Sequence, residues 1–218
     1  MLTSYFTVQT SGNSETVIQK SRFLAYVKRV TTEEEAQAFI EEIKKKHWDA
    51  SHNCSAYLIG ENDLIQKAND DGEPSGTAGV PMLEVLKKRN LKDTCVVVTR
   101  YFGGIKLGGG GLIRAYSAAC SAGINATGVV ERKLSTVCSA VFDYTLLGKI
   151  ENEVRSSSFL LKEITYEEKV TLTCYVQAGE EESFENWIAD LSSGQAETAR
   201  LGVEYLETEV KLTGKERE

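Results

Sequence analysis

Glycine is concentrated in one part of this sequence. The 40 residues from Gly72 to Gly111 contain nine of the 18 glycines and both prolines of the chain. Glycine is used where the backbone takes a positive φ or passes close to another group. The segment is not a linker, because it encloses the β-branched run Thr94–Thr99, whose lack of alternation predicts a strand buried on both faces. We therefore predict that this backbone is shaped for a functional site.

The composition is that of a folded chain. Of 218 residues, 41% are hydrophobic and 26% are charged, as in average globular proteins. The amino terminus does not resemble a secretion signal, and no window of about 18 apolar residues could span a membrane. We expect a cytoplasmic location and no membrane partner. The five cysteines are scattered without a CxxC pair. They are expected to be reduced, mostly buried thiols rather than disulfides or a zinc site.

Charge is distributed unevenly along the chain. Up to Lys133 there are 17 basic and 15 acidic residues, a balance of +2, whereas the remainder has 8 basic and 17 acidic residues, a balance of −9. Binding to nucleic acid needs Lys and Arg side chains that replace the counterions of the phosphates. We therefore expect any anion site in the first part of the chain.

Periodicity predicts two domains, at residues 1–132 and 133–218. In the first, Thr32 and Glu35 form a capping box ahead of an amphipathic helix. Two more helices are predicted on either side of the buried strand, at 77–89 and from Gly111 to about Ala126. Short strands are predicted at 5–10, 16–20, 23–30, 55–59 and 64–68.

From Leu134 onward, the spacing of apolar residues predicts the element order βαββαβ, that of a ferredoxin-like domain. Gly194 is placed to end the second helix of this domain in the left-handed conformation. The predicted fold class is α+β. We expect the boundary between about Thr127 and Leu134 to be exposed and polar, and limited proteolysis to cut there first.

The glycine-rich segment contains a candidate anion site. The four glycines Gly108, Gly109, Gly110 and Gly111 are interpreted as a loop that leads into a helix, whose first amides carry partial positive charge. Arg100, Lys106 and Arg114 flank this loop and could clamp a phosphate or carboxylate. The alternative is that the glycines serve tight packing and that the arginines pair with the acidic residues upstream.

Those acidic residues form a second candidate cluster. Asp70, Asp71 and Glu73 could hold a divalent cation, could act as general acid and base, or could belong to a loop in which Ser75 or Thr77 caps the next helix. Capping is the simplest interpretation, and no metal or catalytic residue is assigned. His52 and Cys54 could form a base and nucleophile, but a buried structural cysteine is the commoner case.

Established nucleotide-binding signatures do not occur in these segments. The spacing from Gly104 to Gly109 is that of a phosphate loop, yet no Lys and Ser or Thr follow it. Position 113 is Ile, so the glycine run does not complete GxGxxG. No cofactor is therefore predicted.

The strings DDGEPSGTAGVPML and VVVTRYFGGIKLGGGGLIRAYSAA closely resemble the signature of the IMPACT family, and in particular of its bacterial two-domain members. The resemblance covers about residues 15–125, and the runs that contain Lys20, Arg22 and His52 also look like family motifs. It adds these three residues to the candidates for binding an anion or nucleic acid. It further implies a first domain like the second domain of a small-subunit ribosomal protein, followed by a ferredoxin-like domain.

What the resemblance implies about function is regulation of translation by binding rather than by catalysis. The expected partner is RNA or the ribosome, bound through the glycine-rich face, or a protein in translational control. The alternative is an enzyme, because small-molecule kinases share a fold of this ribosomal type, and Gly108–Gly111 would then hold a phosphate. A third hypothesis is a regulator that binds only proteins through its acidic second domain. RNA binding should fall steeply with salt, whereas binding in a nucleotide pocket should not.

Overall fold

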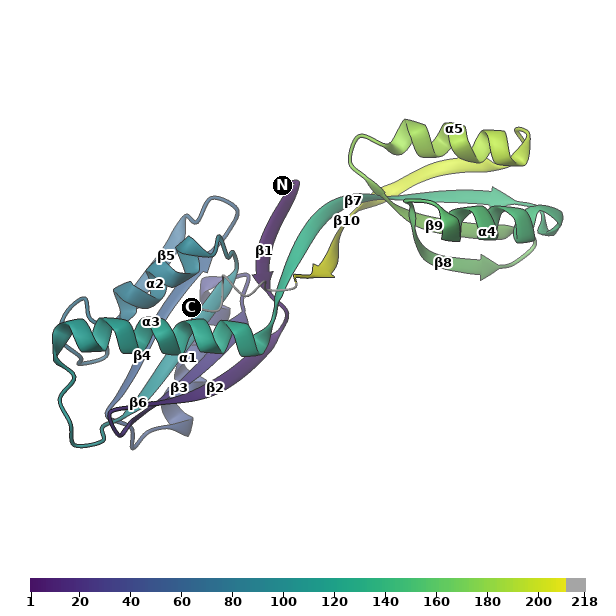
Figure 1. The fold of residues 1–218 in the computed structure, drawn as a ribbon. Helices are drawn as coiled ribbons and strands as arrows, with labels where there is room; N and C mark the ends of the chain where they lie inside the picture. The colour runs from purple at the N-terminus through teal and green to yellow at the C-terminus, as the bar shows by residue number, and fades with distance from the viewer. Residues whose placement is uncertain (211–218) are drawn as a thin grey trace. The chain divides into compact units, whose positions relative to one another are not determined.

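The computed structural model describes residues 1–210 and has the predicted α+β class (Figure 1). Residues 211–218, the end of the predicted second domain, lie outside the described residues. The chain forms two compact units. The first unit comprises Tyr5–Glu131 with residues 208–210, and the second comprises Met1–Ser4 with Arg132–Glu207. None of the helices in the described part of the chain has the length and apolar character needed to cross a membrane.

The first unit is built on one antiparallel sheet with the spatial strand order β2-β3-β6-β4-β5. The central strand is buried from Thr94 to Arg100, so the predicted strand with two covered faces is confirmed. The bounds are β2 (Ser11–Ile18), β3 (Ser21–Arg29), β4 (His52–Ile59), β5 (Ile65–Asn69) and β6 (Thr94–Tyr101).

Helices cover both faces of this sheet. Helix α1 (Glu33–Lys46) packs on one face, and α2 (Gly79–Lys88) and α3 (Gly108–Thr127) pack on the other (Figure 1). The predicted cap of α1 is confirmed, because Thr32 Oγ1 accepts a hydrogen bond of 3.3 Å from the Glu35 amide. Each face of the sheet therefore has its own apolar core.

Helix α3 begins earlier than predicted. The four consecutive glycines are its first turn, from Gly108, rather than a loop that precedes a helix starting at Gly111. Glycine has a low helix propensity, so the sequence pattern places the start of the helix after the glycines. In the structure the packing of the remaining turns, for example through the buried Leu112 and Tyr116, holds the following glycines in the helix, while Gly108 enters it with a positive φ of 69°.

Strand pairing brings several candidate residues to one end of the sheet. Arg100 on β6 lies opposite Phe23 on β3 and opposite His52 on β4. The β2–β3 turn at Gln19 and Lys20, with φ of 44° and 66°, is at the same end. Positive φ at both central residues suits the twist of a two-residue hairpin. The antiparallel register thus gathers segments from three parts of the sequence.

The second unit has the element order predicted from periodicity. β7 pairs with β9 and with β10, and β9 pairs with β8. β1 (Ser4–Val8), which belongs to the first unit from Tyr5 onward, is next to β7 in the strand order. Ser193 and Gly194 take φ of 54° and 76° after α5, as predicted for Gly194. The bounds are β7 (Val129–Phe142), α4 (Leu147–Ser156), β8 (Leu160–Tyr166), β9 (Val170–Gln177), α5 (Glu181–Ser192) and β10 (Glu197–Glu209), with a 3-10 turn at Tyr144–Leu146.

The chain passes from one unit to the other after Glu131, inside the expected interval, but the segment from Thr127 to Leu134 is not an exposed connection. Thr127 is the last residue of α3, and residues 129–134 belong to β7, which continues without a break to Phe142. Val129 and Val130 are buried. The charged residues 131–133 marked the segment as polar, but a paired strand accepts charged side chains on its solvent side.

Candidate functional site

A cleft of about 440 Å³ opens at the end of the sheet where β6 finishes. Its walls come from the start of β4, the acidic loop before α2, the end of β6 with the loop that follows, and the first turns of α3. The lining residues are Ser51, His52, Glu73, Pro74, Arg100, Phe102, Lys106, Leu107, Gly108, Gly109 and Leu112.

The cleft contains some of the candidate residues and not others. Six candidates from four separate sequence segments line it, namely His52, Glu73, Arg100, Lys106, Gly108 and Gly109. The remaining candidates lie outside the lining: Lys20, Arg22, Gly110, Gly111, Arg114, Asp70, Asp71, Ser75 and Thr77.

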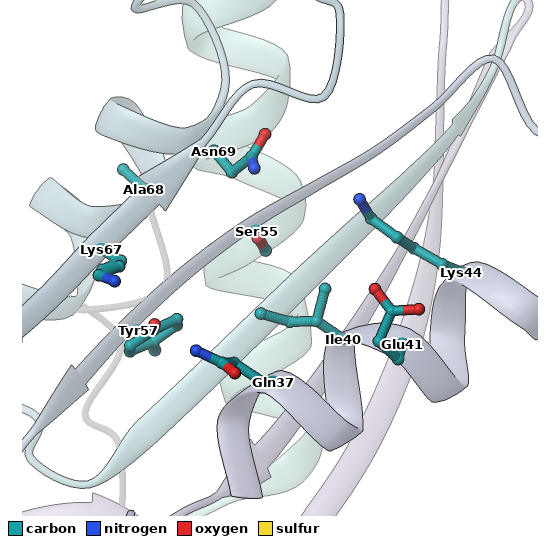
Figure 2. Close-up of a pocket in the computed structure, with 9 residues that line it drawn as sticks. All are labelled: Gln37, Ile40, Glu41, Lys44, Ser55, Tyr57, Lys67, Ala68 and Asn69. Atoms are coloured by element: carbon teal, nitrogen blue, oxygen red, sulfur yellow. The ribbon is translucent and has the colours of Figure 1, made fainter. Parts of the chain in front are cut away.

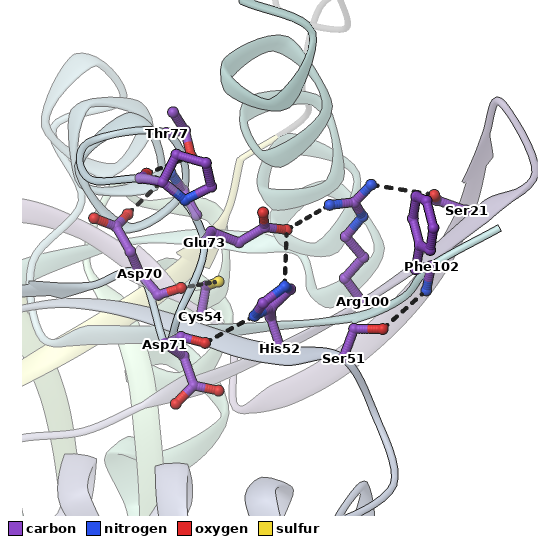
Figure 3. Close-up of polar contacts among 12 residues, drawn as sticks. Ser21, Ser51, His52, Cys54, Asp70, Asp71, Glu73, Thr77, Arg100 and Phe102 are labelled. Carbon is purple, nitrogen blue, oxygen red and sulfur yellow. Dashed lines mark hydrogen bonds and ion pairs between the residues drawn. The ribbon is translucent and has the colours of Figure 1, made fainter. Parts of the chain in front are cut away.

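Arg100 is the buried cation of the cleft. It donates a hydrogen bond of 2.6 Å from Nη1 to Glu73 Oε1, and the two side chains are only 6% and 3% exposed. Nη2 is 3.4 Å from Ser21 Oγ, and the guanidinium carbon lies 5.4 Å from the ring centroids of Phe23 and Phe102 (Figure 3). For Arg100 the structure therefore matches the alternative interpretation, in which an arginine pairs with the acidic loop.

Glu73 also accepts a hydrogen bond of 2.8 Å from the hydroxyl of Tyr116, and burial raises the pKa of that hydroxyl. Next to it, the Cys54 thiol lies 3.0 Å from the backbone oxygen of Asp70. Burial raises the pKa of Cys54 to about 12. A buried, protonated thiol is a poor nucleophile, so Cys54 is a structural residue.

His52 is oriented by the backbone of the acidic loop. Its Nδ1 is 2.8 Å from the Asp71 carbonyl oxygen, and because a carbonyl only accepts, Nδ1 must carry the hydrogen (Figure 3). Nε2 then lies 3.9 Å from Glu73 Oε1, and the side chain is 25% exposed. The imidazole thus presents Nε2 to the cleft.

Asp70 is the cap of the α2 region. Its carboxylate accepts hydrogen bonds of 2.8, 3.0 and 2.8 Å from the amides of Gly76, Ala78 and Gly79. Burial alone would raise the pKa of Asp70, but these three hydrogen bonds outweigh it and the pKa is lowered. The capping interpretation is therefore right, but the residue that caps the helix is Asp70 rather than Ser75 or Thr77. Thr77 Oγ1 instead donates to a backbone oxygen, and Ser75 is exposed.

The three carboxylates of the acidic loop have different partners. Asp71 binds Lys44 Nζ at 2.9 Å and the backbone amide of Asn53 at 2.7 Å. Neither of these groups binds Asp70 or Glu73. Within residues 1–210 no group of three or more His, Cys, Asp or Glu side chains is placed to hold a metal ion.

The first turn of α3 is open toward the cleft. Leu107 at its N-cap makes no side-chain capping bond, no capping side chain is found for this turn within residues 1–210, and Gly108 enters the helix with a φ of 69°. A Cβ added to Gly109 would meet only Thr77 Cγ2, at 3.9 Å. Lys106, an exposed residue just before the helix, adds a full positive charge. Unpaired helix amides beside a lysine favour an anion.

The candidates outside the cleft have other surroundings. Arg22 makes two hydrogen bonds to Glu15, of 2.6 and 3.1 Å, so its charge is already paired. Lys20 is exposed in the β2–β3 turn. Its backbone packs closely against Gly103, and a Cβ added to Gly103 would overlap the Lys20 backbone. Arg114 is exposed on α3.

A second groove lies between α1 and the strands β4 and β5 (Figure 2). Its volume is about 330 Å³, and its lining includes Lys44, Tyr57 and Lys67. Tyr57 and Lys67 both bind Glu33, at 2.6 and 3.0 Å. None of the residues that line this groove is a sequence-predicted candidate.

Sequence reasoning missed Phe102, which lines the cleft and is 50% exposed. An aromatic residue directly after a buried strand is expected in the core, so only its position between Arg100 and two glycines could have marked it.

Comparisons with known proteins agree with the sequence signature. A profile described as Impact N-terminal domain matches residues 19–124, and one described as a domain of unknown function (DUF1949) matches residues 141–195. A protein of Bacillus subtilis (strain 168) named IMPACT family member YvyE is 63% identical over 210 residues, which cover 96% of this chain and 97% of that protein. The chain belongs to the IMPACT family.

More distant IMPACT proteins match as well. IMPACT family member YigZ of Escherichia coli (strain K12) is 34% identical, with 81% of this chain and 88% of that protein covered. The mouse protein named Protein IMPACT is 36% identical over 41% of this chain and 29% of its own length. A solved structure described as a hypothetical protein has a TM-score of 0.59 at 29% identity, covering 92% of this chain and 98% of that one.

Proposed function

We propose that this IMPACT-family protein is a non-enzymatic, cytoplasmic binding protein connected with translation. In this proposal it binds phosphate groups of RNA at the cleft where α3 begins. The link to translation rests on family membership. The choice of ligand rests on one observation, the uncapped first turn of α3 beside the exposed Lys106.

The electrostatics of the cleft support an anionic ligand of modest charge. The charge of Arg100 is balanced by Glu73 at 2.6 Å. Among the described residues that line the cleft, Lys106 is therefore the cation with its charge available to a ligand. Helix amides and one lysine suit a phosphodiester, which carries a single negative charge.

A second candidate is a phosphate-ligand enzyme, and the volume of the cleft favours it. About 440 Å³ is within the range of small-molecule sites. In that case the first turn of α3 would hold the phosphate of a small substrate.

The experiment is titration of a labelled ribosomal RNA fragment, followed by fluorescence anisotropy over a series of salt concentrations. Wild type should show the steep salt dependence of phosphate binding. Lys106→Gln should reduce the slope of log K against log salt by about one, for one lost phosphate contact. Salt-independent binding of a nucleotide, without RNA binding, would favour the enzyme.

Two glycine variants test the role of the helix start. Gly109 lines the cleft and Gly110 does not, while a Cβ at Gly110 would meet only Arg114 Nη1, at 3.7 Å. Alanine at either position should leave the helix intact or stabilise it by up to about 1 kcal/mol. Gly109→Ala should weaken RNA binding, and Gly110→Ala is the matched control. Equal binding by Gly109→Ala and wild type would contradict the proposed site.

A further inference from the structure

The cleft contains an exposed aromatic ring held in a defined position. Phe102 is 50% exposed, and its amide donates a hydrogen bond of 3.1 Å to Ser51 Oγ. The Arg100 guanidinium lies 5.4 Å from the ring centroid. This cation is itself fixed by its ion pair with Glu73. A large aromatic side chain held in this way offers a preformed surface for stacking.

A second feature of the cleft indicates a ligand. Arg100 Nε is buried and has no hydrogen-bond partner among the described residues, although the side chain is only 6% exposed. A buried N–H without an acceptor is costly. Arg100 is among the residues that line the cleft, so this unsatisfied N–H lies in the wall of the proposed site, beneath its surface.

The other lining residues form one apolar part and one positively charged part of the cleft. Pro74, Leu107 and Leu112 supply apolar surface, whereas Lys106 and the first turn of α3 supply positive charge. A phosphate alone needs no apolar wall. A planar base attached to a phosphate would use both kinds of surface, and a cleft of about 440 Å³ can accommodate one such unit.

We infer that the cleft takes one unpaired nucleotide of a single RNA strand, with its phosphate at the first turn of α3 and its base against the ring of Phe102. This inference rests on the proposed function. A duplex keeps its bases stacked inside, so it could present only phosphate to the cleft. A carboxylate of an acidic peptide would bind the amides and Lys106 but would not use the ring.

The test compares single-stranded RNA of about 12 nucleotides, within the usual site sizes for single-strand binding, with the same sequence as a duplex. Wild type should bind the single strand more tightly. Phe102→Leu keeps an apolar side chain but removes the ring, and should weaken single-strand binding by about tenfold without changing the salt slope. Phe102→Trp should retain binding, and its added indole fluorescence should be quenched by the RNA.

Ile105→Leu is the matched control. Ile105 belongs to the same loop and is 40% exposed, but it does not line the cleft. It should bind RNA as wild type does. Circular dichroism of each variant checks that the protein is folded.

The outcomes separate the inference from the proposed function. If Phe102→Leu binds the single strand as tightly as wild type, or if the duplex binds as well as the single strand, the inference is overturned. The proposed function then still stands, provided that Lys106→Gln lowers the salt slope. If wild type binds neither RNA but binds a glutamate-rich peptide, the proposed function fails and the inference fails with it.

Discussion

Removal of the Arg100 guanidinium should destabilise the first unit more than any exposed charge substitution. Arg100→Ala leaves the Glu73 carboxylate, 3% exposed, without the cation that lies 2.6 Å from it. Breaking a buried ion pair by removing one partner costs about 3 to 5 kcal/mol. Tyr116 still donates a hydrogen bond to Glu73. We therefore expect a loss near the lower end, about 3 kcal/mol.

Guanidinium chloride unfolding, followed by far-UV circular dichroism, measures this loss. Trp187 packs against Phe159 and Phe184 in the second unit. In a Trp48→Phe background its fluorescence serves as an internal control, and the denaturant midpoint that it reports should equal that of the same background with Arg100 intact. The double variant Arg100→Ala, Glu73→Gln should recover part of the loss, since a neutral amide needs no cation. A loss below about 1 kcal/mol, as for an exposed pair, would refute this reasoning, as would an equal loss in the single and double variants.

Three further predictions concern other parts of the structure. Asp70→Asn should lower the free energy of unfolding by about 1 to 2 kcal/mol at neutral pH. Because the folded pKa of Asp70 is lowered, the contribution of its carboxylate is present above about pH 4 and lost below it. Urea unfolding at a series of pH values should therefore show a smaller loss of stability on acidification in the variant than in wild type. Gly103→Ala should lower the melting temperature sharply, because its Cβ would overlap the Lys20 backbone, and a normal melting curve would show that the hairpin can move. The five buried cysteines should react with a thiol reagent only on unfolding; rapid labelling of native protein near pH 8 would contradict the burial that raises the pKa of Cys54 to about 12.

The parts of the fold that depend on neighbours in sequence were predictable. The cap at Thr32 involves residues three positions apart, and the buried strand from Thr94 is marked by its own composition. The start of α3 was not predictable. Glycine has a low helix propensity, which disfavours a helix that begins at Gly108, but the packing of later turns of the helix outweighs this propensity. The first part of β7, residues 129–134, was not predicted, because its charged side chains are not typical of a strand and its partners lie far away in sequence.

Six residues that line the candidate site were identified from the sequence, but their arrangement was not. Lys106 and the glycines were identified from composition and spacing. The burial of Arg100 depends on the register that sets it opposite Phe23 and His52, and no local pattern encodes this register. Which carboxylate pairs with Arg100 depends on the path of the acidic loop, so Glu73 could not be distinguished from Asp71 beforehand.

The division of the chain into units has a consequence for its synthesis. The chain passes from one unit to the other after Ser4, after Glu131 and after Glu207. Within the first unit the Val210 amide donates to the Val129 oxygen, and within the second the Leu134 amide donates to the Thr3 oxygen. As the polypeptide emerges in order from the ribosome, the first unit can form most of its core early but receives Val210 only after the whole second unit has been synthesised. A premature stop in the second unit would therefore also leave the first unit incomplete.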